Sequence, residues 1–75
     1  MTEVTVDARG MLCPLPIVEL ARAAKAAAAG DLITVECTDV AARVDVPAWA
    51  RMTGNEFVGE TETDGEAIAL TVRLR

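Results

Sequence analysis

The sequence Cys13-Pro14-Leu15-Pro16 stands directly before the longest helical pattern of the chain. Pro14 disfavours α geometry at Cys13, and its own fixed φ suits the first position of a helix. Pro16 still falls within the first turn, where its missing N–H breaks no helical hydrogen bond. We therefore predict that Cys13 is the N-cap of a helix that runs from Pro14 to about Ala29.

A cysteine at a helix N-terminus is a candidate nucleophile, because the helix dipole and unpaired amides favour the thiolate. Pro14 and Pro16 have no N–H, so the amides of Cys13 and Leu15 are the donors expected near the sulfur. The chain has no histidine, which excludes a Cys-His dyad and imidazole ligands for a metal. These features predict a lowered pKa at Cys13. The alternative is an inert, half-buried cysteine that serves only packing.

The overall composition indicates a small globular domain spanning residues 1–75, with 52% hydrophobic residues and a formal net charge of -5. An acidic chain opposes direct binding to nucleic acid and favours a protein partner with a basic patch. The sequence has no basic, apolar leader and no apolar run long enough for a membrane span. We expect a cytoplasmic protein that does not contact membranes.

Alternating apolar residues predict strands at residues 3–7, 31–38, 57–62 and 67–74. Gly59 is interpreted as a bulge or a place of close approach, and Asp64-Gly65 as the turn of a hairpin. Between strands, Gly30 ends the first helix, and a second helix is expected from an N-cap at Asp45 to a stop at Gly54. The order β-α-β-α-β-β predicts an α/β (α+β) two-layer sandwich with two helices on one face of a four-stranded mixed sheet.

The first two strands flank a helix, so we expect them to be parallel and to bring Cys13 to their carboxyl edge. Cys37 ends the second strand on its apolar face, which predicts a buried and inert thiol. A redox protein with a Cys13-Cys37 disulfide remains an alternative, although the chain has no C-x-x-C motif. We interpret Asp39 and Asp45 as capping or turn residues rather than acid/base groups. Met11, beside the cysteine, is assigned to a docking edge, with a core contact as the alternative.

The pattern Asp7-x-x-Gly10-x-x-Cys13-Pro14-x-Pro16 resembles the N-terminal signature of the TusA-like (SirA, YedF, YeeD) sulfur-carrier family. The resemblance extends over nearly the whole chain. It includes the segments Gly30-Asp31, Thr38-Asp39, Asp45-Val46-Pro47-Ala48-Trp49 and Thr53-Gly54-Asn55-Glu56. Val40 and Ala50 depart from residues common in that family, and neither lies in the Cys-Pro-x-Pro core.

The resemblance implies the same two-layer fold and a function as a sulfur carrier or sulfurtransferase. Cys13 would hold sulfane sulfur as a persulfide, with Pro14, Pro16, Arg9 and Gly10 supporting the site. The implied partners are a donor protein, of the cysteine desulfurase or rhodanese type, and an acceptor protein in a sulfur relay. No cofactor and no metal are expected, and a monomer is favoured. The alternative from another class is a non-catalytic protein-binding module in which Cys13 is incidental.

Overall fold

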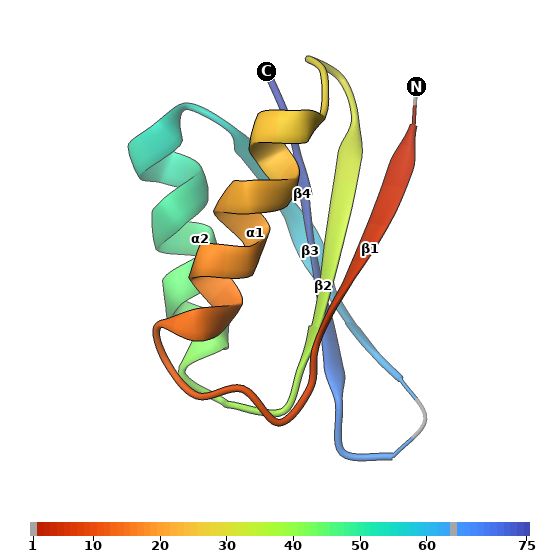
Figure 1. Ribbon diagram of the computed structural model, residues 1–75, viewed down its shortest axis with the longest axis vertical. Coiled ribbons are helices and arrows are strands. Elements are labelled where there is room, and N and C mark those ends of the chain that lie inside the picture. Colours follow the sequence, from red (N-terminus) through yellow and green to blue (C-terminus); the bar gives the residue numbers. More distant parts are fainter. Residues whose placement is uncertain (1, 64) are drawn as a thin grey trace.

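Two helices cover one face of a four-stranded sheet in this computed structural model, which describes residues 2–63 and 65–75 (Figure 1). The elements follow the predicted order. They are β1 (Glu3–Ala8), α1 (Leu15–Ala26), β2 (Leu32–Cys37), α2 (Ala42–Thr53), β3 (Glu56–Glu62) and β4 (Ile68–Arg73). The predicted α+β two-layer sandwich is thereby confirmed.

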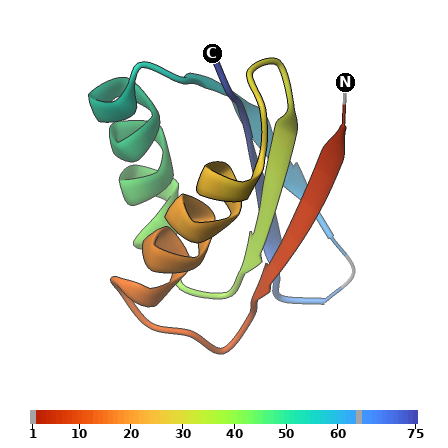
Figure 2. The same ribbon diagram turned by 45° about the horizontal axis from the view of Figure 1, so that its top comes forward.

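The sheet has the strand order β1-β2-β4-β3 and is mixed. β1 and β2 are parallel, as expected from the helix between them, with Ala8 opposite Cys37 at their carboxyl ends. β4 is antiparallel to both β2 and β3. The loops that follow β1 and β2 therefore emerge at the same edge of the sheet, where Figure 2 shows them side by side.

The core fills the space between the helices and the sheet. Alternation in β2 directs Ile33, Val35 and Cys37 towards the helices, and all three are fully buried. The helices and β4 complete this core with Leu20, Val46, Ala50, Leu70 and Val72. On the open face, Thr34 and Thr71 share a hydrogen bond of 2.8 Å between their hydroxyls.

The predicted bulge in β3 is confirmed by a register shift between Phe57 and Gly59. After the shift, Glu60 lies opposite Leu70 and so faces the helices. There its carboxylate accepts a hydrogen bond of 3.0 Å from Arg43 of α2. The predicted turn at Asp64-Gly65 includes Asp64, which lies outside the described residues; Glu62 and Ile68 pair on either side of it.

The first helix is shorter at its C-terminus than the sequence predicted. It ends at Ala26, and Ala27 is already extended. The Asp31 carboxylate accepts hydrogen bonds from the amides of Ala28 and Thr2, and the Gly30 amide donates to the carbonyl of Leu74. These tertiary bonds turn the chain before Gly30, so Gly30 is not the residue that follows the helix.

The second helix begins three residues before the predicted N-cap. Its first turn is initiated from Asp39, whose carboxylate accepts the Ala41 amide and whose carbonyl accepts the Ala42 amide. Asp45 is therefore inside the first turn, and Pro47 lies inside the helix. The predicted end is confirmed, because Gly54 caps the helix with a φ of 77°.

Among the described residues, neither helix has the length and apolar character that crossing a membrane requires.

Candidate functional site

Cys13 is exposed in the loop between β1 and α1, at the edge where β1 and β2 end. The N-cap of α1 is Pro14, and Leu15 is its first helical residue. The prediction that Cys13 is the N-cap was therefore wrong by one residue. The peptide bond between Cys13 and Pro14 is cis.

Hydrogen bonds hold this loop against the loop that follows β2. The Gly10 amide donates to the Thr38 hydroxyl at 3.0 Å, and the Cys13 amide donates to Oδ2 of Asp39 at 2.9 Å. Asp39 thus has two roles, because its other oxygen starts the turn into α2. The predicted turn function of Asp39 is confirmed, and the same carboxylate also positions the backbone of Cys13.

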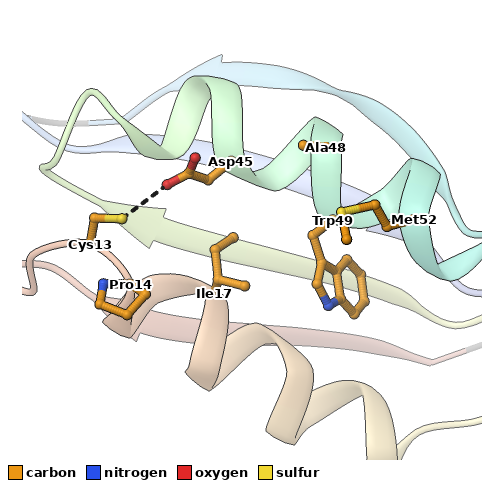
Figure 3. A pocket seen from close by; sticks show the side chains of 7 residues that line it. All are labelled: Cys13, Pro14, Ile17, Asp45, Ala48, Trp49 and Met52. Atoms are coloured by element: carbon orange, nitrogen blue, oxygen red, sulfur yellow. Dashed lines mark hydrogen bonds between the residues drawn. The ribbon is translucent and has the colours of Figure 1, made fainter.

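The thiol of Cys13 donates a hydrogen bond to Oδ2 of Asp45 at 3.3 Å (Figure 3). Asp45 projects from the first turn of α2, across from the start of α1. The interpretation of Asp45 as a helix cap was therefore wrong, because α2 begins at Ala42 and no side chain caps it. Sequence reasoning missed this contact, which depends on the four-residue difference between the predicted N-cap, Asp45, and the observed one, Ala41.

The electrostatics at Cys13 are opposite to the prediction. The hydrogen bond to Asp45, followed by desolvation and the negative charges of Asp45 and Asp39, raises the pKa of the Cys13 thiol. The two amides that were expected near the sulfur have other acceptors, since Cys13 donates to Asp39 and Leu15 donates to the Leu12 carbonyl. The lowered pKa predicted for Cys13 was therefore wrong.

A groove of about 360 Å³ begins at Cys13 and runs between the two helices. In Figure 3 Cys13 and Asp45 lie at one end of it, and Trp49 and Met52 lie at the other. The residues that line it are Cys13, Pro14, Ile17, Asp45, Ala48, Trp49 and Met52. Except for the thiol and the carboxylate, these side chains offer an apolar surface. Trp49 packs on the core and lines this groove.

The other residues assigned to the site differ in their relation to Cys13. Pro14 lines the groove, and Pro16 is buried in the first turn of α1. Gly10 has a φ of 80°, which is a left-handed conformation suited to glycine, and it ties the loop to Thr38. Arg9 instead forms an exposed ion pair of 2.8 Å with Asp7. This pair, with the Arg9 amide, lowers the pKa of Asp7 to about 2.

The two residues before the thiol differ in burial. Met11 is half-buried and packs against the core, whereas Leu12 is 72% exposed. Met11 therefore makes the core contact that was the alternative to a docking edge. Cys37 is fully buried, as predicted, and its thiol points to the Ile68 carbonyl at 3.9 Å. Both cysteines are free thiols. Within the described ranges, no group of three or more Cys, Asp or Glu side chains converges to hold a metal ion.

Comparisons with known proteins agree on one family. The family described as "Sulfurtransferase TusA" matches residues 4–74. The putative sulfur carrier protein YrkF of Bacillus subtilis is 38% identical over 65 residues, which are 87% of this chain and 35% of YrkF. The chain thus spans about a third of that relative. A putative sulfur carrier protein of Neisseria meningitidis is also 38% identical, over 87% of this chain and 88% of its own length.

A solved structure supports the same relationship. The crystal structure of the SirA-like protein of Desulfitobacterium hafniense superposes with a TM-score of 0.81 and is 28% identical in sequence. The match covers 93% of this chain and 95% of that one.

Proposed function

Because this chain belongs to the TusA sulfurtransferase family, a family of sulfur carriers, we propose that it holds sulfane sulfur as a persulfide on Cys13 and passes it to an acceptor protein. The observation that carries this proposal is the position of Cys13. It is an exposed thiol in a loop fixed by two hydrogen bonds, at the open end of an apolar groove. A carrier whose substrate is another protein's sulfur needs this access.

The transfer balances without an oxidant or a cofactor. Cys13 loses its thiol proton, and its Sγ attacks the sulfane sulfur of a donor persulfide. The S–S bond of the donor breaks, and the donor leaves as a thiolate that takes up a proton. Cys13–SH and donor–S–SH thus become Cys13–S–SH and donor–SH, and delivery to the acceptor repeats this exchange in the other direction.

The partners in this relay are a sulfur donor, of the cysteine desulfurase or rhodanese type, and an acceptor protein. Exposed apolar side chains in the loop before Cys13 and on α2 fit contacts with such proteins, because exposed apolar patches mark interaction sites. Leu12 precedes the cysteine, Val44 precedes Asp45, and Met52 lies in the groove; all three are more than two thirds exposed. We place the relay in the cytoplasm, where a reducing environment keeps a nucleophilic thiol free.

In the supporting part of the site, Pro14 and Pro16 shape the start of α1, and Gly10 holds the loop to Thr38. Arg9 supports the site indirectly, through its pair with Asp7 at the end of β1. The disulfide alternative has less support, because Cys37 is 0% exposed and would have to leave the core to meet Cys13.

The test is intact-protein mass spectrometry after incubation with a cysteine desulfurase and cysteine, followed by peptide mapping without reductant. We expect a gain of one sulfur, about 32 Da, on the peptide that holds Cys13. Cys13→Ser should abolish this gain, and Cys37→Ser should nearly retain it. Equal loss in both variants, with both folded, would overturn the assignment, as would a Cys13-Cys37 disulfide in place of the added sulfur. Thiosulfate with a rhodanese provides the second donor, so a negative result requires failure with both.

A further inference from the structure

The proposed nucleophile lies beside negative rather than positive charge. Asp45 contacts the Cys13 thiol from α2, and Asp39 holds the Cys13 amide from the loop after β2. The cationic side chains nearest in the sequence have other partners, and Arg43 of α2 pairs with Glu60. Residues 14–18 at the start of α1 are uncharged, and Arg9 in the loop before Cys13 is bonded through its guanidinium to both oxygens of Asp7.

We propose that Asp45 is a positioning residue that directs the Cys13 thiol through their hydrogen bond, and that makes Cys13 react selectively with a partner sulfur flanked by positive charge. This inference rests on the proposed function and specifies its partner. A cationic side chain next to the partner's sulfur pairs with Asp45, removes the acceptor of the thiol hydrogen bond and stabilises the thiolate that forms.

The second step of the relay follows from the same geometry. When sulfur is loaded, a persulfide anion on Cys13 faces the same two carboxylates, which disfavour the anion. The carrier therefore holds sulfur less firmly once a cationic donor has left. At delivery, positive charge beside the acceptor cysteine offsets the negative charge of the two carboxylates. Partners with acidic surroundings are disfavoured at both steps.

The groove adds a shape requirement to this charge requirement. Asp45 and Cys13 are the polar groups at one end, and the surface between them and Met52 is apolar. A partner that approaches the sulfur thus presents a cation beside its own reactive sulfur and an apolar side chain that reaches the groove. A partner with only the cation or only the apolar side chain leaves part of the groove uncovered. The experiment tests the requirement for the cation.

Thiol–disulfide exchange with small symmetrical disulfides tests the charge selectivity without any sulfur donor. The probes are cystamine, which is cationic, 2-hydroxyethyl disulfide, which is neutral, and 3,3′-dithiodipropionate, which is anionic. Rates with the protein are divided by rates with N-acetylcysteine amide, so that intrinsic reactivity cancels. The interaction of two unit charges about 4 Å apart in water changes a rate by about fivefold. This factor favours the cationic probe and disfavours the anionic one, so we expect cystamine to be favoured over the anionic probe by at least tenfold.

Asp45→Asn is the test variant, since it keeps the shape of the side chain and removes the charge. We expect it to slow the reaction with cystamine about fivefold relative to the neutral probe and to move the pH midpoint of Cys13 alkylation by iodoacetamide downward. Glu3→Gln is the matched control. It removes one charge from the opposite end of β1 and should leave both measurements within twofold. A purely structural role for Asp45 would not change selectivity by probe charge.

Wild-type protein alone keeps the proposal falsifiable if Asp45→Asn folds poorly. At about 1 M salt charges are screened beyond about 3 Å. Under that condition the rate of the protein with cystamine, relative to the other two probes, should approach the relative rate of the reference thiol. Equal relative rates for the three probes at low salt would overturn the proposal, as would an unchanged preference in folded Asp45→Asn. Neither result bears on sulfur loading by mass spectrometry, so this inference and the proposed function fail separately.

Discussion

Cys13 and Cys37 lie at the same edge of the sheet, where the parallel strands β1 and β2 end. Cys37 is the last residue of β2 and lies opposite Ala8, the last residue of β1. Its place in the alternation of the strand directs it under the helices, where it is fully buried. Cys13 comes five residues after β1, in a loop that carries it beyond the core to the exposed end of α1. The comparison shows that a short loop is enough to separate an accessible thiol from a structural one.

The two thiols share one electrostatic property for different reasons. The pKa of Cys37 is raised first by desolvation, whereas the pKa of Cys13 is raised first by its hydrogen bond to Asp45. A raised pKa therefore does not distinguish the reactive cysteine from the inert one here. Access distinguishes them, and access can be measured.

The largest expected difference is in the rate of alkylation of the folded protein. We expect iodoacetamide to modify Cys13 directly, while Cys37 reacts only through openings that expose the core. Even a domain with a free energy of unfolding of about 5 kcal/mol is open about one part in several thousand, so Cys37 should react at least about a thousandfold more slowly. Peptide mapping over time gives both rates in one sample. Comparable rates for the two residues would contradict the comparison, and equal rates in urea provide the control.

The next largest effect is on stability, from Cys37→Ser. The substitution places a hydroxyl in the apolar core, and we expect a loss of about 1–3 kcal/mol in the free energy of unfolding. Cys13→Ser, at an exposed position, should change it by less than about 0.5 kcal/mol. Urea unfolding followed by circular dichroism measures both. A larger loss from Cys13→Ser than from Cys37→Ser would reverse the assigned roles.

The features predicted correctly from sequence are those fixed by local patterns. Alternation in β2 identified the burial of Cys37, and Gly59 identified the bulge in β3. Gly54 marked the end of α2 because a left-handed residue is needed there. In each case the physical cause lies within a few residues of the feature, so the sequence contains it.

Of the features predicted wrongly, the start of α2 follows from a local turn at Asp39, whereas the surroundings of Cys13 depend on contacts across the chain. Asp45-Val46-Pro47 has the local pattern of a helix start, but Asp39 begins the helix earlier and frees Asp45 to reach Cys13. The amide of Cys13 is bound by Asp39, 26 residues away, so the expected effect of the helix N-terminus is lost. No periodicity or spacing in the sequence indicates these two contacts, because they require the packing of the loop after β2 and of α2 against the β1–α1 loop.

A smaller effect is expected from Gly10→Ala, which tests how the loop holds Cys13 away from the core. Gly10 has a φ of 80°, where an alanine costs about 1 kcal/mol, although no atom lies within 4 Å of the added Cβ. We expect a loss of that size in urea unfolding and a modest change in Cys13 alkylation, because the loop is bound through the Gly10 amide. Thr38→Val is the matched variant, since it removes the acceptor of that amide without backbone strain. If Thr38→Val leaves Cys13 alkylation unchanged while Gly10→Ala alters it, backbone strain and not the hydrogen bond positions the loop.

The smallest expected effect is the titration of the carboxylate that fixes the Cys13 backbone. Hydrogen bonds from the amides of Ala41 and Cys13 lower the pKa of Asp39. A carboxylate with a lowered pKa in the folded protein stabilises the fold fully above its unfolded pKa of about 3.9, and this contribution is lost as the pH falls through the folded value. We therefore expect the amide signals of Ala41 and Cys13 to shift together in an NMR titration, with a common midpoint below about 3.9.

The chain contains its own control for this titration. Asp31 accepts the amides of Ala28 and Thr2, which lower its pKa in the same way, and it lies beyond α1 at the other end of β2 from Cys13. In Asp39→Asn the signals of Ala41 and Cys13 should stop titrating, while that of Ala28 should shift as in the wild type. Separate midpoints for Ala41 and Cys13 would mean that one carboxylate does not bind both amides. The loop of the exposed cysteine would then be tied to the loop after β2 through the bond between Gly10 and Thr38, and Asp39 would not contribute to the contrast with Cys37.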